Sequence, residues 1–165
     1  MGGGLYNADG EFIGIVNAKK IDEEIESMGY AIPSNLVRSV VENLMYYCDW
    51  TNESSGKVLN LGITHSIVDS YAGFDENDDT VRIFEKVAVK SIDTGSVASR
   101  YFEVGDILVG AEINGNYHSF TAKYHAEELL LDIIIGDSVV YHVERGGLEI
   151  KITLTFTESN YVKIK

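Results

Sequence analysis

The sequence has 165 residues, 45% of them hydrophobic and 10% aromatic, enough for a buried core in one domain of ordinary size or in one small domain plus a fragment. Thirteen basic residues against 26 acidic ones give a formal net charge of −13, which argues against a nucleic-acid binder and against a helix lying on an anionic membrane. The single cysteine, Cys48, excludes an internal disulfide and a cysteine-based zinc site.

The first 50 residues contain strand signals followed by one helix. Asp9-Gly10 is a turn dipeptide between two strand-like runs and predicts a β-hairpin over residues 5–18. Residues 19–27 are charged and lack an apolar face, so we expect an exposed loop there. Residues 29–32 read as a third short strand, which Pro33 ends.

A helix is predicted after Pro33, with Ser34 as its N-cap. Apolar residues recur behind it at three- and four-residue spacing and form one stripe: Leu36, Val37, Val40, Val41, Leu44, Met45 and Cys48. Cys48 is thus expected to be a buried, inert thiol. Residues 51–56 are polar and predict a linker, so the chain should divide into residues 1–50 and 57–165.

From Lys57 onward the pattern is that of a compact sheet module. We expect a loose acidic stretch at residues 69–79, a short helical piece at 97–102 and a helix at 122–131. Turn signals such as Asn114-Gly115 separate the strands. The predicted strands are residues 58–64, 82–92, 107–113, 138–145 and 148–157.

No metal, cofactor or membrane segment is predicted. Asp75, Asn77 and Asp79 imitate the start of a calcium loop, but Thr80 stands where that loop needs glycine. The four histidines are dispersed, without ligand spacing on one helix. The longest apolar stretch, residues 129–135, falls far short of the roughly 20 residues that span a bilayer. We therefore expect a soluble chain.

One tetrapeptide, Asn60-Leu61-Gly62-Ile63, suggests a specific site. Glycine lets successive backbone N–H groups turn into a concave nest that can receive a carboxylate, and apolar neighbours can wall a pocket for the ligand's last side chain. Lys57 could add a positive charge nearby. The alternative is a core strand with a glycine bulge.

Residues 57–157 resemble a PDZ domain of the bacterial HtrA/Deg type. The tetrapeptide comes first, followed in order by Asp93-Thr94-Gly95-Ser96, Gly105-Asp106, Asn114-Gly115 and the helix from Ala122. The order ends with Gly136-Asp137 and Val143-Glu144-Arg145-Gly146-Gly147. The sequence departs from the family where Asn60 replaces a common aromatic residue, which concerns ligand preference rather than fold.

The opening of the chain resembles the end of a trypsin-like domain from the same family. It is carried by Gly2-Gly3-Gly4, by Asp9-Gly10-Glu11-Phe12, and by residues 29–35. In that family the nucleophilic serine precedes the paired glycines; here Met1 holds that position, and Gly4 replaces the usual proline. Asn17 and Ala18 match a strand that lines the substrate cleft. The resemblance thus implies a C-terminal piece without a catalytic triad, inactive alone, of a parent serine endopeptidase.

The fold class implied is α+β. It comprises a PDZ-type β-sandwich or partly open barrel capped by two helices, preceded by a β-hairpin, strand and helix from the end of a trypsin-like β-barrel. The resemblance also implies a role in bacterial protein quality control and an extracytoplasmic or membrane-anchored parent.

The function implied is capture of an extended peptide C-terminus by β-augmentation, to recruit substrates to the protease or to regulate it. The peptide would lie along Ile63, Thr64 and His65, with its carboxylate at the N–H groups of Leu61, Gly62 and Ile63. The opposite wall would be formed by Ala126, Leu130 and Ile133, at i, i+4 and i+7 of the helix. His125 either contacts a ligand side chain or is simply exposed. The expected partners are C-terminal or extended peptides of unfolded or regulatory proteins.

A competing hypothesis is strand-mediated assembly. Residues 5–18 would form a hairpin whose edges lack partners, and exposed edges recruit other strands, including those of a second copy. Such a homo-oligomer would need no C-terminal peptide recognition.

Overall fold

The computed structural model describes residues 2–22, 25–47, 56–76 and 79–163, and only the backbone of residues 18–22 and 25–29. The chain divides into two compact units, Met1–Gly56 and Lys57–Lys165. The linker expected at residues 51–56 lies outside the described residues except for Gly56, and so does Cys48.

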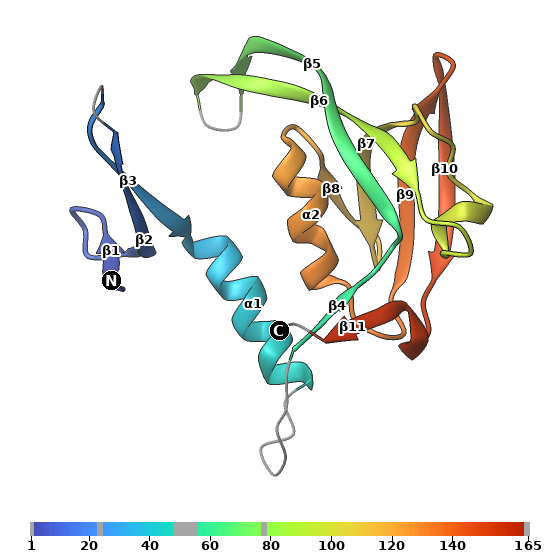
Figure 1. The fold of residues 1–165 in the computed structure, drawn as a ribbon, viewed down its shortest axis with the longest axis horizontal. Helices are drawn as coiled ribbons and strands as arrows, with labels where there is room; N and C mark the ends of the chain where they lie inside the picture. The colour runs from blue at the N-terminus through green and yellow to red at the C-terminus, as the bar shows by residue number, and fades with distance from the viewer. Residues whose placement is uncertain (1, 23–24, 48–55, 77–78, 164–165) are drawn as a thin grey trace. The chain divides into compact units, whose positions relative to one another are not determined.

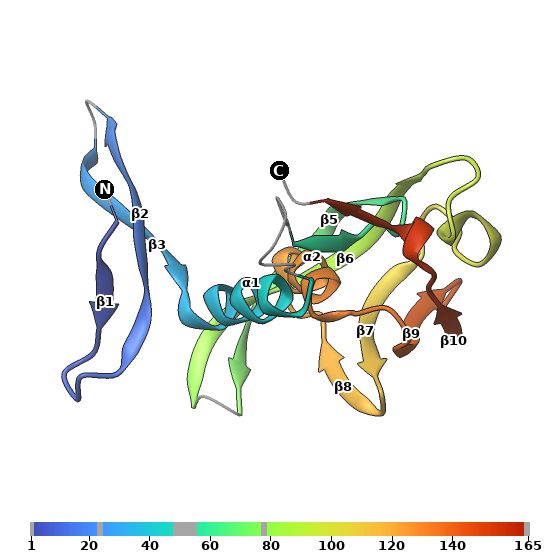
Figure 2. The same ribbon diagram turned by 90° about the horizontal axis from the view of Figure 1, so that it is seen from below.

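The first unit begins with a three-stranded antiparallel sheet in the order β1-β2-β3 (Figure 2). Its strands are β1 (Gly4–Tyr6), β2 (Phe12–Asp22) and β3 (Ile25–Pro33). The Asp9-Gly10 turn joins β1 to β2, as predicted. Gly10 has a left-handed φ of 82°, and the Asn7 side-chain oxygen accepts the N–H groups of Asp9 and Glu11 at 3.0 and 2.9 Å.

The prediction of an exposed loop at residues 19–27 is wrong. β2 and β3 remain paired as far as Asp22 and Ile25, so the strands carry through most of the charged stretch. A β-ladder uses backbone N–H and C=O groups, which every one of these residues has, and therefore needs no apolar face to continue.

Helix α1 (Ser34–Tyr47) follows β3 directly, as predicted from Pro33 and Ser34. Its apolar stripe is only partly buried: Val41 is 46% exposed and Met45 67%. The helix has the expected bounds, but its one buried side chain among the described residues is the polar Asn43, which does not belong to the predicted stripe.

The second unit is mostly β, with one α-helix. The main antiparallel sheet has the strand order β10-β9-β7-β6-β5, with β8 paired to β7, and β4 pairs with β11 in a separate two-stranded sheet (Figure 1). Its strands are β4 (Lys57–Leu59), β5 (Ile63–Asp75), β6 (Thr80–Ile92), β7 (Ile107–Ile113), β8 (Asn116–Ser119), β9 (Ser138–Arg145), β10 (Leu148–Thr155) and β11 (Tyr161–Lys163); its helices are α2 (Lys123–Asp132) and the short 3₁₀ turns η1 (Ala98–Arg100) and η2 (Glu158–Asn160).

The core of this unit lies between the sheet and α2. Leu129 and Ile133, at the end of the helix, are buried with side chains from the strands and from the β6–β7 connection. Phe102 meets Tyr141 edge to face at 5.5 Å between ring centres. Strand side chains that are 2% exposed or less include Tyr141, Leu59, Leu108, Leu154, Val87, Val89, Val139 and Val143.

Several elements agree with the sequence prediction. β7 and β9 have the expected bounds, and α2 is displaced by one residue. Asn114 and Gly115 both have positive φ, 50° and 86°, as the tight hairpin turn between β7 and β8 requires. The fold class is thus confirmed at the level of a mostly β chain with two α-helices and open sheets.

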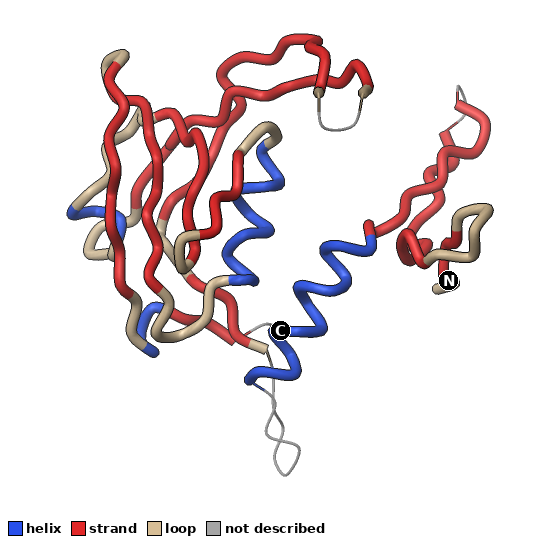
Figure 3. The backbone as a smooth tube through the Cα atoms, turned by 180° about the vertical axis from the view of Figure 1, so that it is seen from behind, coloured by secondary structure: helices blue, strands red, loops and turns tan. Residues whose placement is uncertain are grey.

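The acidic stretch at residues 69–79 is not loose. β5 continues to Asp75 and β6 starts at Thr80, so the two strands form a long hairpin whose far half extends beyond the pairing of β6 with β7 (Figures 1 and 3). Tyr71 stacks on Phe84 with 5.4 Å between ring centres. Asp75 forms an ion pair with Arg82, whose guanidinium lies over Phe84. These cross-strand pairs stabilise the hairpin despite its polar sequence.

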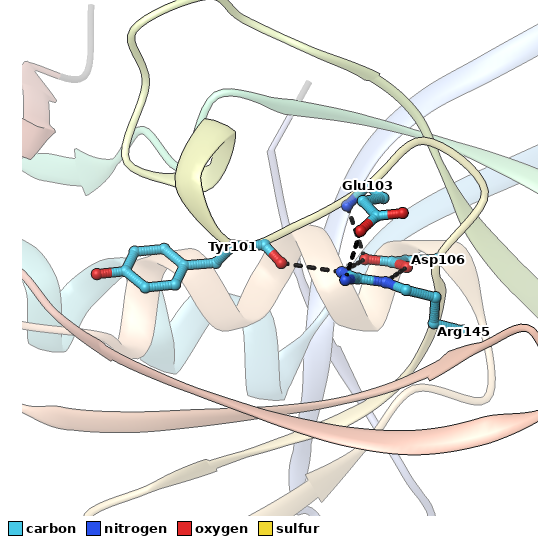
Figure 4. Close-up of polar contacts among 4 residues, drawn as sticks. All are labelled: Tyr101, Glu103, Asp106 and Arg145. Carbon is cyan, nitrogen blue, oxygen red and sulfur yellow. Dashed lines mark hydrogen bonds and ion pairs between the residues drawn. The ribbon is translucent and has the colours of Figure 1, made fainter.

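An ion pair at the start of β7 secures the connection between β6 and β7. Asp106, whose side chain is fully buried, accepts two hydrogen bonds of 2.7 Å from the Arg145 guanidinium on β9 (Figure 4). Arg145 also donates to the Tyr101 carbonyl at 2.9 Å and to the exposed Glu103 carboxylate at 2.7 Å. Burial opposes ionisation of Asp106, but the hydrogen bonds from Arg145 and from the Glu103 N–H outweigh it and lower the pKa of this carboxyl.

Replacing Asp106 with Asn is expected to lower the free energy of unfolding of residues 57–165 by about 3–5 kcal/mol, because it leaves the Arg145 charge without its buried partner. Urea unfolding followed by circular dichroism measures this loss. The matched control is Glu103→Gln: its carboxylate meets the same guanidinium but is 67% exposed, so we expect a loss below about 1 kcal/mol. Equal losses in the two variants would contradict a special role for Asp106.

Candidate functional site

The loop between β4 and β5 interrupts the strand predicted at residues 58–64. β4 ends at Leu59 and β5 begins at Ile63, with Asn60, Leu61 and Gly62 between them. Gly62 has a φ of 77°, a backbone conformation that glycine adopts without strain. The tetrapeptide therefore forms a turn before an edge strand rather than a bulge within one continuous strand.

Two backbone hydrogen bonds join the β4–β5 loop to the connection between β6 and β7. The Leu61 carbonyl accepts the Ala98 N–H at 3.3 Å, and the Gly62 carbonyl accepts the Asp93 N–H at 2.8 Å. The Leu61 side chain is buried, at 4% exposed. A Cβ atom on Gly62 would lie 2.2 Å from the Cβ of Ser96, so only glycine fits here without displacing that connection.

Two of the groups expected to attract a ligand carboxylate have internal partners. The Gly62 N–H donates to the Asn60 side-chain oxygen at 3.1 Å. The Lys57 ammonium forms an ion pair with Glu158 on η2, and this hydrogen bond and charge lower the pKa of the Glu158 carboxyl. The Leu61 N–H group donates no hydrogen bond to another described residue.

β5 lies beside α2 where it leaves the loop (Figures 1 and 3). Burial lowers the pKa of His65 on β5, the Glu127 carboxylate of α2 opposes this effect, and the Lys123 ammonium adds to it. Lys123 and Glu127 are themselves an i,i+4 ion pair with 3.1 Å between charged atoms. His65 therefore sits within the electrostatic influence of the helix, while Thr64 bonds to Ser91 on β6.

The three helix residues predicted to form the opposite wall lie in different environments. Ala126 is 3% exposed and Ile133 0%, so both belong to the core and Ile133 has no surface to offer a peptide. Leu130 is half-buried and remains available at the surface of the helix. The sequence pattern placed these residues on one face because they are three and four apart, but it did not separate the buried face from its half-exposed neighbour.

His125 is oriented toward β6 rather than β5. Its pKa is lowered by burial and by the Arg82 charge, with Glu85 opposing, and its Nδ1 lies 3.3 Å from the Thr121 hydroxyl. Glu85 fixes the start of α2: its carboxylate accepts the Lys123 N–H at 2.7 Å, and its own N–H donates to the Thr121 carbonyl at 2.9 Å. The sequence analysis missed Glu85 because the capped helix lies 38 residues further along the chain.

The first unit contains the residues that the sequence resemblance relates to a protease domain. Met1, which holds the nucleophile position of the family pattern, lies outside the described residues. Asn17 is exposed on β2, and Ala18 pairs with Tyr30 through the backbone. Among the residues that the structure describes, no group of three or more His, Cys, Asp or Glu side chains could hold a metal ion, and Asn77 is not among them. No described helix is long and apolar enough to cross a bilayer.

Comparison with known proteins finds similarity to HtrA-type proteases. The chain is 28% identical over 155 residues to the serine protease Do-like HtrA of Bacillus subtilis (strain 168), covering 90% of this chain and 32% of that protein. It is 29% identical over 164 residues to the serine protease Do-like HtrB of the same organism, covering 95% of this chain and 33% of that protein. No protein-family model matches.

Solved structures agree on the fold. Two structures of the HtrA-type protease AlgW with decapeptide superpose with TM-scores of 0.52 and 0.50, at 16% and 18% identity. They cover 92% and 91% of this chain and 43% of each matched chain.

The resemblance to the HtrA/Deg family is thereby confirmed: the chain is related to HtrA-family serine proteases over nine-tenths or more of its length. It spans about a third of the length of those curated relatives.

Substitution at Gly62 tests the close approach to Ser96. Gly62 and Gly95 have nearly the same φ, 77° and 80°, but an added Cβ at Gly95 meets nothing within 4 Å. Gly95→Ala should therefore cost only the backbone strain of about 1–2 kcal/mol, and Gly62→Ala clearly more. Adding Ser96→Gly to Gly62→Ala should recover part of the difference. Equal costs at the two glycines, by urea unfolding, would refute the close approach.

The two histidines whose pKa values are lowered predict a pH dependence of stability. The folded chain resists protonating His65 and His125, whereas the unfolded chain protonates them below about pH 6.5. Their contribution to stability is therefore lost as the pH falls below that value, and the free energy of unfolding should drop between pH 7 and 5. The double variant His65→Asn, His125→Asn should show a flatter profile in urea titrations at each pH; an unchanged slope would contradict the assignment.

Proposed function

We propose that residues 57–165 form a peptide-binding PDZ module that captures extended protein C-termini by β-augmentation. The observation that carries the proposal is the position of β5: it is an edge strand of the main sheet, it lies beside α2, and it begins directly after the left-handed Gly62 turn. An edge strand offers unpaired backbone groups to an incoming strand, and the adjoining helix offers side chains that select among peptides.

Two further observations support the proposal. The order of sequence landmarks across residues 57–157 resembles that of an HtrA/Deg PDZ domain, and the superposed AlgW structures are of a protease with decapeptide. In this chain the peptide would run along Ile63, Thr64 and His65, with Leu130 of α2 on the other side. The binding would recruit substrates to an HtrA-type protease or regulate it, as part of protein quality control.

Strand-mediated assembly is a second candidate, favoured by the long β5–β6 hairpin. Beyond the pairing of β6 with β7, both outer edges of this hairpin lack partner strands among the described residues. Its exposed apolar side chains include Val68, Tyr71, Phe74, Val81 and Ile83, between 55% and 72% exposed. Concentration-dependent sedimentation without any peptide binding would favour assembly over recognition.

Peptide binding can be measured by fluorescence anisotropy of the whole chain with labelled decapeptides that end in an apolar residue. We expect a free C-terminal carboxylate to bind about tenfold more tightly than the amidated peptide, which corresponds to about 1.4 kcal/mol. Leu130→Glu should weaken binding by a similar factor, because it places a charge where an apolar side chain is expected to dock.

Leu148→Glu is the matched control. Leu148 is 71% exposed on β10, at the opposite edge of the main sheet, so this variant should bind like the wild type. Equal affinity for the free and amidated peptides would overturn carboxylate recognition. Equal weakening by both substitutions would show that added negative charge acts from a distance and not at α2.

A further inference from the structure

The Asn60 side chain occupies the donor that a ligand carboxylate would need. Its amide oxygen accepts the Gly62 N–H at 3.1 Å, two residues along the chain, which is the geometry of an Asx turn. The Asn60 backbone is anchored as well, since its N–H donates to the Asn160 carbonyl at 2.8 Å. Asn160 in turn caps η2 by accepting the Thr157 N–H at 2.9 Å. Both the side chain and the backbone of Asn60 are therefore held by hydrogen bonds.

An amide oxygen is a neutral equivalent of one carboxylate oxygen, so the two compete for the same N–H group. We propose that Asn60 is an internal competitor for the carboxylate of a bound peptide and thereby sets the affinity of the β4–β5 loop for C-terminal ligands. This inference rests on the proposed peptide-binding function. A peptide that reaches the loop must displace the Asn60 amide from Gly62 or share the donor with it, and a shared N–H forms two weaker hydrogen bonds.

Lys57, like Gly62, already has an internal partner. Its ammonium group is paired with Glu158 on η2, the turn whose last residue anchors Asn60. The nearest cation proposed for a ligand carboxylate therefore already has an anion beside it. The Gly62 donor and the Lys57 charge are both engaged, so neither is open to an incoming carboxylate until these internal contacts break.

A purely structural role is the alternative, because an Asx turn also stabilises the left-handed conformation of Gly62. Two substitutions separate the roles. Asn60→Ala removes the competing oxygen together with the turn. Asn60→Asp keeps an oxygen that can accept from Gly62 and adds a negative charge, so it preserves the turn while it opposes a ligand carboxylate more strongly.

The first measurement needs no ligand. Amide hydrogen exchange at Gly62, followed by NMR, should be faster in Asn60→Ala than in the wild type and no faster in Asn60→Asp. Thermal unfolding of the three proteins checks that residues 57–165 remain folded. Unchanged Gly62 exchange in Asn60→Ala would show that Asn60 does not protect this donor and would overturn the inference.

The second measurement is anisotropy with the free and amidated decapeptides that end in an apolar residue. Asn60→Ala should bind the free acid about three- to tenfold more tightly than the wild type, the range expected for removing one competing hydrogen bond. The amidated peptide should change less than about twofold, because its neutral carbonyl forms a weaker hydrogen bond with the Gly62 N–H than a carboxylate does. Asn60→Asp should bind the free acid more weakly than the wild type.

The outcomes distinguish the inference from the function on which it rests. If the wild type prefers the free acid but Asn60→Ala binds it no more tightly, the competition is refuted and peptide recognition stands. Equal tightening for both peptides would show that Asn60 limits access by its size, which also refutes competition. If no protein distinguishes the acid from the amide, carboxylate recognition itself fails, and the inference fails with it.

Discussion

The ion pair between Asp106 and Arg145 fixes one end of the segment on which the candidate site depends. At that end, Arg145 holds the carboxylate of Asp106 and the carbonyl of Tyr101. At the other end, Asp93 and Ala98 hold the carbonyls of Gly62 and Leu61. The connection between β6 and β7 is therefore bonded to the β4–β5 loop near one end and to β9 through a charge pair near the other.

The structure shows a loop whose donor and neighbouring cation are satisfied from within. A buried or partly buried N–H group without an acceptor costs free energy. An internal acceptor therefore stabilises such a loop while no ligand is bound. Asn60 supplies that partner for Gly62, and Glu158 supplies an anion for Lys57. Under the proposed function, the same contacts that stabilise the loop reduce the free energy that a ligand carboxylate would gain there.

Local signals predicted those elements that local chemistry determines. The turns at Asp9-Gly10 and Asn114-Gly115 use backbone angles that few residues adopt. Two adjacent residues were therefore enough to predict each turn. The far half of the β5–β6 hairpin could not be found in this way, because its strands are held by pairs such as Tyr71 with Phe84, 13 residues apart. The site shows the same division: the sequence indicated the tetrapeptide around Gly62 although a strand was predicted across it, whereas the Glu85 cap on α2 depends on residues far apart in sequence. The Asn60 contact was within reach of the sequence, since asparagine two residues before glycine favours an Asx turn.

Competition by Asn60 also bears on which ligands the loop would favour. A neutral carbonyl that replaces the Asn60 amide exchanges one neutral hydrogen bond for another and gains little. A carboxylate exchanges a neutral hydrogen bond for a charge-assisted one, which is roughly twice as strong. Peptides whose only contact at Gly62 is a backbone carbonyl, such as internal segments crossing the loop, would thus gain nothing from displacing Asn60. Under this proposal, asparagine at this position would therefore favour true chain ends over internal extended segments, while it lowers the affinity for both.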